Sequence, residues 1–241
     1  MEAYAKRRRG EGDQTVRFQK FFGSGGGKPF LPSDVVGMAA WFRNGLSITV
    51  TGAGVSQWDD QSGNGRHLKQ TADTNRPALQ ADGSILFDGS DNFLKCDAFT
   101  LAQPETVYLL AKQITSTNGD APFDGDTLTS MRMQQTSTPF SILINAGAGA
   151  CGNGNWLSNT YAVLCSVFNG ASSLTQVNQG APSTGDPGAA NAGGFTLGAT
   201  GGATAFANIE VKEVIVYSGA HDATTRLQII NYLATIGGIA L

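Results

Sequence analysis

Two stretches that pass from strand-like to turn-forming residues constrain the fold of this chain most. The first, residues 55–67, ends an apolar segment with a Trp and then turns through Asp, Ser, Asn and Gly. The second, residues 85–94, repeats the order of strand, Asp-Gly turn and strand. Asp, Ser and Asn bond nearby backbone groups, and Gly allows positive φ. We therefore predict tight loops on a sheet, held by Trp58, Asp59, Ser62, Gly63, Asn64, Gly65, Asp88 and Gly89.

Short apolar runs separated by glycine recur along the whole chain. Glycine supplies 32 of the 241 residues, about twice its usual share, and sits in clusters between those runs. This pattern indicates many tight turns, and one all-β domain of this length is ordinary. Candidate strands cover residues 41–43, 46–50, 55–58, 67–70, 77–80, 84–87, 92–95, 106–113, 130–134, 140–145, 161–168, 174–178, 195–198 and 209–217.

Only the end of the chain changes to a helical period. Asp222 can cap a helix over residues 223–236, and two glycines follow it. Leu227, Ile230, Leu233 and Ile236 recur at helical spacing, so we expect them to form the buried stripe. Residues 147–152 match GxGxxG, but no helix follows, so we expect a loop there and another over residues 181–194.

The first 30 residues differ from the rest. They hold seven basic and three acidic residues, whereas the remainder holds nine basic and sixteen acidic ones. Three Phe precede a Gly-Ser run, so this arm either packs against its own domain or docks on another protein. Its candidate docking residues are Arg7, Arg8, Arg9, Arg17, Phe18, Phe21 and Phe22. We expect no nucleic-acid partner, because the basic run is short and the acidic body repels phosphates.

Residues 55–67 and 87–94 resemble the first half of concanavalin A-like lectin/glucanase (laminin-G-like) domains of bacteriophage virion proteins. Residues 177–180, 195–198, 209–217 and the terminal helix resemble the second half. The resemblance covers residues 31–241 and implies an antiparallel two-sheet jelly-roll sandwich with one C-terminal amphipathic helix. Residues 1–30, the extended arm, lie outside it. Because this fold serves lectins, glycosidases and structural modules, it does not fix a function.

The glucanases of this fold resemble one another in a Glu-x-Asp-x-x-Glu strand. The nearest stretch here holds Glu210 and Glu213 without the central Asp, and in a regular strand these two point to opposite faces. A retaining glycosidase needs two carboxyls about 5–5.5 Å apart. We therefore expect no catalytic residues and no enzyme, with a glycoside hydrolase as the last alternative.

Other site chemistry is sparse. Calcium is a candidate cofactor at Asp59, Asp60 and Asn64 or at Asp88, Asp91 and Asn92, but these side chains also suit the capping of their own turns, so we expect no metal or cofactor. Trp41 and Trp58 are expected in the core. Trp156 lies in a polar loop and is the candidate glycan contact.

The three cysteines, Cys96, Cys151 and Cys165, lack a metal spacing, and we expect reduced thiols, although a Cys151–Cys165 bridge is conceivable. No apolar run is long enough for a membrane span, so we expect no membrane partner.

The resemblance and the arm together favour a non-enzymatic phage virion protein, assembled in the bacterial host cytoplasm. The arm would anchor it to other virion proteins of the capsid or tail, and the jelly roll would project as a decoration or fibre module. We also expect a homo-oligomer. The alternative is a module that binds a surface glycan or host receptor.

Overall fold

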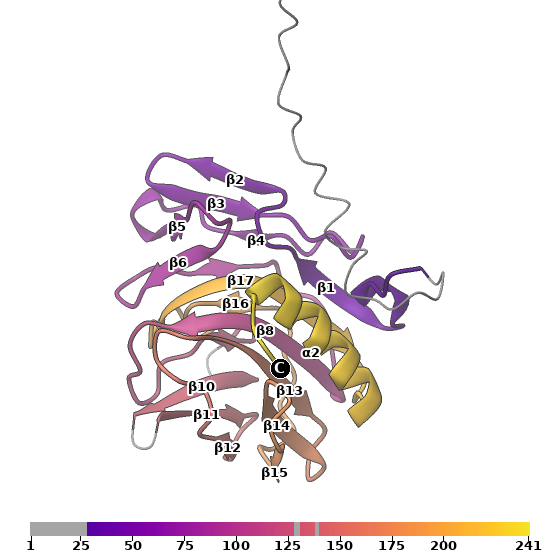
Figure 1. Cartoon of the computed structure of the whole chain (residues 1–241). Coiled ribbons are helices and arrows are strands. Elements are labelled where there is room, and N and C mark those ends of the chain that lie inside the picture. Colours follow the sequence, from indigo (N-terminus) through magenta and orange to yellow (C-terminus); the bar gives the residue numbers. More distant parts are fainter. Residues whose placement is uncertain (1–27, 128–130, 138–139) are drawn as a thin grey trace, which may run out of the picture.

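The computed structural model describes residues 28–127, 131–137 and 140–241. Two antiparallel sheets pack face to face, and one helix lies against the outer side of one sheet (Figure 1). The expected all-β sandwich with a C-terminal helix is confirmed. Residues 1–27, with all the candidate docking residues of the arm, lie outside the described residues.

The first sheet, here sheet A, has eight strands in the order β15-β14-β13-β8-β17-β6-β5, and β1 also pairs with β17. The strands are β1 (Met38–Phe42), β5 (Ala78–Leu79), β6 (Ile85–Asp88), β8 (Glu105–Gln113), β13 (Tyr161–Phe168), β14 (Ser173–Val177), β15 (Ser183–Gly185) and β17 (Asn208–Ser218). The long strand β17 pairs with β8 along one side. Its other side is shared, first by β6 and then by β1.

The second sheet, here sheet B, has nine strands in the order β12-β11-β10-β9-β16-β7-β4-β3-β2. The strands are β2 (Ile48–Thr51), β3 (Gly54–Trp58), β4 (Leu68–Lys69), β7 (Leu94–Lys95), β9 (Phe123–Asp124), β10 (Arg132–Ser137), β11 (Phe140–Asn145), β12 (Gly149–Asn153) and β16 (Thr196–Leu197). Two short 3₁₀ helices, η1 (Pro32–Asp34) and η2 (Asp73–Asn75), complete the elements together with α2 (Ala223–Gly237).

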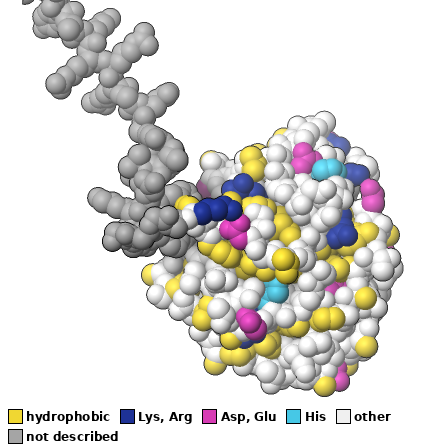
Figure 2. All heavy atoms as spheres, turned by 90° about the vertical axis from the view of Figure 1, so that its right-hand side faces the viewer, with side chains coloured by type: hydrophobic (Ala, Val, Ile, Leu, Met, Phe, Trp, Pro, Cys, Tyr) yellow, Lys and Arg dark blue, Asp and Glu magenta, His cyan; other side chains and the backbone are white. Residues whose placement is uncertain are grey.

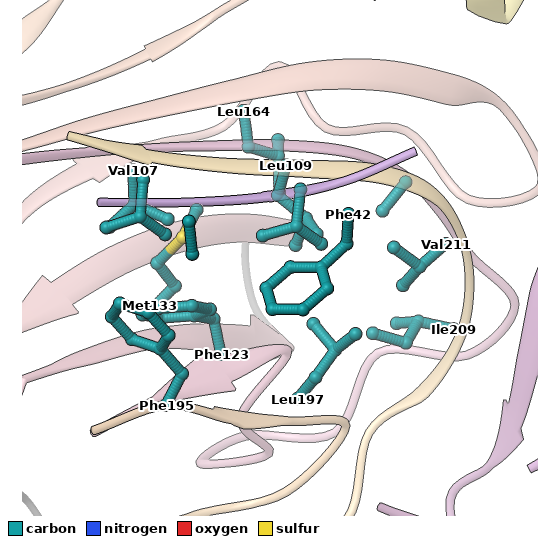
Figure 3. Close-up of a cluster of buried hydrophobic side chains, with 14 of the residues drawn as sticks. Phe42, Val107, Leu109, Phe123, Met133, Leu164, Phe195, Leu197, Ile209 and Val211 are labelled. Atoms are coloured by element: carbon teal, nitrogen blue, oxygen red, sulfur yellow. The ribbon is translucent and has the colours of Figure 1, made fainter. Parts of the chain in front are cut away.

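The main core lies between the two sheets. Figure 3 shows Phe42, Leu109 and Ile209 of sheet A lying among Phe123 and Leu197 of sheet B. Side chains alternate across a strand, so every second residue of these strands enters this core. Burial of this apolar surface is the main force that holds the sheets together.

A second core lies on the outer face of sheet A, beneath α2. Tyr108 and Leu110 of β8 pack there with Ile229, Ile230 and Leu233 of the helix. Because β8 is covered on both faces, eight of its nine residues are buried. This explains the continuous apolar run that the sequence shows at residues 106–111.

The helix begins and ends where the sequence predicts. The Asp222 carboxylate accepts from the backbone N–H of Thr225 at 2.8 Å, and Gly238 ends the helix in the left-handed conformation. The expected stripe is wrong in one member, because Leu227 is 40 % exposed. Arg226 takes the buried place beside it and donates from Nε to the Gln176 amide oxygen at 3.0 Å.

Two segments expected as loops contain strands. Residues 149–153 form β12, which pairs with β11 with an irregular register, and residues 183–185 form β15, which pairs with β14. Small residues in these segments hide the alternation that marks a strand.

Among the described residues, no helix has the length and apolar character needed to cross a bilayer.

Candidate functional site

The outer face of sheet B holds a polar groove of about 580 Å³. Thr49 of β2 pairs with Gln57 of β3, and Gln57 pairs with Lys69 of β4. Paired residues of neighbouring strands share a face. The next pair, Trp58 and Leu68, is buried in the core, so the row Thr49–Gln57–Lys69 faces outward.

This polar row continues across sheet B but is covered beyond Lys69. Lys69 pairs with Lys95, Lys95 with Thr196, and Thr196 with Asp124. The Lys95 ammonium donates to the backbone carbonyls of Asp126 and Gly201, and Thr196 and Asp124 are fully buried. The segments after β9 and β16 therefore cover this part of the row from solvent, and the groove ends beside Lys69.

Asp124 fastens that cover to the sheet. Its carboxylate accepts the backbone N–H groups of Gly125, Met131 and Gly201 at 2.8, 3.3 and 3.0 Å. Burial raises the pKa of Asp124, and these three hydrogen bonds offset only part of the rise. The half of the row from Lys95 to Asp124 is thus covered by the protein itself. The half from Thr49 to Lys69 is accessible to a ligand.

Arg76 forms a fixed part of the groove wall. Its guanidinium donates to the carbonyls of Gln70, Thr51 and Thr71 at 3.1, 2.6 and 3.1 Å, and it pairs with Asp73. These bonds engage all three guanidinium nitrogens. Arg76 therefore holds β2, β4 and η2 in place, because four of its five N–H donors are used within the protein.

The polar groups open to a ligand lie along the groove floor and rim. The Gln57 amide donates to Asp59 Oδ1 at 2.6 Å, which orients the rest of that amide. The Lys69 ammonium lies 3.0 Å from Asp97, whose side chain is 90 % exposed, and exposed pairs of this kind are weak. The exposed hydroxyls of Thr49 and Thr71 complete the set. Such a lining can supply hydrogen bonds to a polyhydroxyl ligand.

A second polar cluster lies on the outer face of sheet A, beside the area that α2 covers. Glu210 accepts from Tyr161 and Ser84 through Oε1 and pairs through Oε2 with Lys112 at 2.7 Å. The Lys112 and Lys212 ammonium groups lie 4.9 and 4.4 Å from the centre of the Tyr161 ring. Burial acts to raise the pKa of Glu210, but hydrogen bonds from Lys112, Tyr161 and Ser84 outweigh it and lower that pKa.

Glu210 and Glu213 do not point to opposite faces as expected. The register of β17 against β8 shifts between Val211 and Glu213, and this bulge adds a residue to one strand. Both glutamates therefore lie on the outer face. Glu213 is only 1 % exposed, accepts from the Trp41 indole at 2.7 Å, and has a pKa raised by burial. It joins β17 to β1 beneath α2.

The turn residues of 58–65 bond backbone from two segments. Ser62 Oγ and the Asn64 amide donate to the Ala39 carbonyl at 3.3 and 3.0 Å, which ties this loop to β1. The sequence offered Asp60 as a calcium candidate that also suits the capping of its own turn, and the structure shows the capping role. The Asp60 carboxylate accepts backbone N–H groups of Trp41, Ser62 and Arg66 at 2.9, 2.9 and 3.1 Å.

The second turn is held in a similar way. Asp88 Oδ1 accepts the backbone N–H groups of Ser90 and Asp91 at 2.9 and 3.4 Å, and Gly89 has a positive φ of 76°. Trp58 is fully buried. Within the described part of the chain, no three His, Cys, Asp or Glu side chains gather as a metal site.

Trp156 is not a surface contact. It is 0 % exposed, and its backbone carbonyl accepts from the Gln113 amide inside the domain. The neighbouring Asn155 is exposed while the indole enters the core, which corrects the assignment of Trp156 as a glycan contact. Cys96, Cys151 and Cys165 are all buried free thiols, so the conceivable Cys151–Cys165 bridge is absent.

Neither a known family model nor a curated protein matches the chain. Solved structures of similar fold include a Trypanosoma rangeli sialidase with 2,3-difluorosialic acid, at a TM-score of 0.63 and 12 % identity over 84 % of this chain and 34 % of that one. An arabinofuranosidase with arabinofuranosyl-alpha-1,2-xylobiose has a TM-score of 0.59 and 14 % identity over 76 % and 51 %. The chain thus spans about a third of the sialidase and half of the arabinofuranosidase.

A single-domain neighbour matches over nearly its whole length. Domain 4 of an extracellular GH43 arabinanase from Geobacillus stearothermophilus, in complex with arabinotriose, has a TM-score of 0.54 and 12 % identity. The match covers 83 % of this chain and 98 % of that domain. These neighbours support the concanavalin A-like type of sandwich, without a link to bacteriophages.

The expectation of a non-enzymatic phage virion protein is contradicted by these comparisons. The similar structures named above are sialidase, arabinofuranosidase and arabinanase chains, which are glycoside hydrolases. The expectation failed because the turn blocks of residues 55–67 and 87–94 identify a sandwich that many proteins share, and they carry no information on what the sandwich is attached to.

Proposed function

We propose that this chain is a carbohydrate-binding sandwich domain of the kind that occurs in glycoside hydrolases, and that its ligand lies in the groove of sheet B. The observation that carries the proposal is the row Thr49–Gln57–Lys69, open to solvent in a hollow of about 580 Å³. Ligand pockets commonly measure about 300–1,000 Å³. The fold supports the same reading, because the arabinanase domain of like architecture was solved with arabinotriose.

The groove chemistry favours a neutral oligosaccharide. Hydroxyl, amide and ammonium groups converge from three strands. The hydroxyls and amides can donate to or accept from a sugar hydroxyl, and the ammonium can donate to one. The cationic groups are balanced, since Arg76 pairs with Asp73 and Lys69 with Asp97. Each of these two cations has a carboxylate partner, so they give an anionic sugar little electrostatic advantage over a neutral one.

The test is calorimetric titration with arabinotriose, xylo-oligosaccharides and sialyllactose, followed by variants for the best ligand. We expect Gln57→Ala and Lys69→Ala to weaken binding about tenfold each, since a lost hydrogen bond costs about 0.5–1.5 kcal/mol. The matched control is Gln228→Ala, an exposed glutamine of α2 on the opposite face. Equal affinity in all four proteins, or no binding of any sugar, would refute the groove as the site.

The same mixtures can be assayed for new reducing ends. Their release by the purified chain would mean that it cleaves its ligand as well as binding it. In an NMR titration, the Gln57 and Lys69 resonances would shift until the site is saturated. Such shifts without release of new reducing ends would indicate binding alone.

A further inference from the structure

An apolar pocket of about 200 Å³ lies between the start of the described chain and α2. Pro29, Phe30 and Leu31 line one side, and the helix residues Gln228, Asn231, Tyr232 and Thr235 line the other. Figure 2 shows the face that carries this helix, where hydrophobic side chains gather at the surface. We propose that this pocket receives a phenylalanine from residues 18–22 of the same chain.

The point at which the chain enters the domain is fixed beside this pocket. The Lys28 ammonium pairs with Asp34 at 2.6 Å, and the same carboxylate accepts the backbone N–H of Leu31 at 2.9 Å. The Tyr217 hydroxyl donates to the Pro32 carbonyl at 2.8 Å. Phe30 and Val35 also pack against the core beneath α2. Whatever precedes residue 28 therefore starts at the rim of the pocket.

The sequence that precedes this point supplies the occupant. Phe18, Phe21 and Phe22 are followed by Gly23-Ser24-Gly25-Gly26-Gly27. Seven residue steps separate Phe22 from Pro29, a reach of up to about 23 Å at 3.3 Å per step. This reach is long enough for residues 18–22 to return to the pocket.

The pocket also has the size and chemistry for one aromatic ring. A cavity of about 150 Å³ lined by apolar side chains accepts benzene, and this pocket is slightly larger. The rings of Phe30 and Tyr232 offer edges and faces for a third ring to pack on. Occupation by residues 18–22 would cover apolar surface on the side of the sandwich opposite the groove.

A cysteine trap tests the proposal directly in the full chain. The double variant Phe21→Cys with Thr235→Cys should form a disulfide within one chain under mild oxidation, since the three native cysteines are buried. The matched control joins Phe21→Cys to Thr49→Cys in the groove on the opposite face. A cross-linked monomer only in the first variant supports the proposal. A cross-linked dimer, or equal yields in both variants, overturns it.

Thermal unfolding gives a second readout. Replacement of Phe18, Phe21 and Phe22 together by Ala should lower the Tm by about 3–10 °C, the shift expected for the loss of one buried ring in a domain of this size. Replacement of the same three by Leu should retain most of the Tm, because an apolar side chain still fills the pocket. An unchanged Tm in the Ala variant would overturn the proposal.

Discussion

The indole N–H of Trp41 donates to Oε1 of Glu213 at 2.7 Å, and this bond joins β1 to β17 beneath α2. The two side chains are 5 % and 1 % exposed. The other carboxylate oxygen faces the backbone N–H of Asn44 at 3.5 Å. Because neither donor can turn to water, Glu213 serves as their common acceptor.

Removal of that acceptor should be costly. We expect Glu213→Ala to lower the free energy of unfolding by about 3 kcal/mol, since it leaves a buried donor unpaired and opens a cavity. Glu213→Gln keeps an acceptor of the same shape and should cost about 1 kcal/mol. Urea unfolding of the three proteins measures the difference. Equal losses in Ala and Gln would mean that the carboxylate charge, which both variants lack, matters here, and neither the shape nor a neutral acceptor.

Glu105 should make the stability depend on pH. Burial raises its pKa to about 8. The unfolded chain releases the same proton near 4.5. Between these values the native state holds more protons, so stability is full below pH 4.5 and falls as the pH rises to about 8, by at most about 1.4 kcal/mol per unit.

The variant Glu105→Gln isolates this contribution. It keeps the size of the side chain and cannot ionise, so its free energy of unfolding should fall less than that of the parent between pH 5 and 8. Urea titrations at pH 5, 6, 7 and 8 give the two slopes. Parallel slopes would show that Glu105 ionises equally in both states.

Gly198 should tolerate no side chain. Its φ is 84°, and a Cβ there would overlap the ring of Phe87, which is fully buried. We expect Gly198→Ala to cost about 3 kcal/mol, from left-handed strain and displacement of the ring. Gly170→Ala is the matched control, since Gly170 also has positive φ but its Cβ would meet open space. It should cost about 1 kcal/mol, and equal losses would assign the whole effect to the backbone.

Two neighbouring aspartates should differ sharply. Asp60 is 7 % exposed and holds three backbone N–H groups, so Asp60→Ala should cost about 3 kcal/mol or more. The Asp59 side chain is 34 % exposed and meets only Gln57 and His67, so Asp59→Ala should cost less than about 1 kcal/mol. Thermal and urea unfolding of both variants check the order, and a larger loss at Asp59 would reverse our assignment.

Much of the fold could be predicted from local pattern. The strand Tyr161–Phe168 and the cap at Asp222 have the residues predicted for them, because β-branched runs and capping side chains act over a few positions. The segment 149–153 could not be recognised, because its small residues carry no alternation and it becomes a strand only beside β11. The buried stripe of the helix was predicted wrongly at Leu227. Arg226, a charged residue, takes the buried position because its guanidinium donates to Gln176 on β14.

The candidate site could not be predicted. The groove joins Thr49, Gln57, Lys69 and Arg76, and only the order of β2, β3 and β4 in the sheet brings them together. Alternation can tell which face a residue occupies, but not which strand lies next to it. The bulge in β17 likewise moved Glu213 to the face of Glu210, and a bulge leaves no mark in this sequence.

The shared pairing of β17 has a consequence for how this chain can reach its native state. Residues 208–218 connect β8 on one side with β1 and β6 on the other. Three strands from the first half of the chain therefore cannot complete their pairing until this last strand is in place. Without β17, sheet A consists of three separate pieces, namely β15-β14-β13-β8, β6-β5 and β1, with unpaired edges and uncovered apolar faces. Such long-range closure makes folding slow, and fragments that stop before residue 208 should aggregate instead of forming a smaller version of the domain.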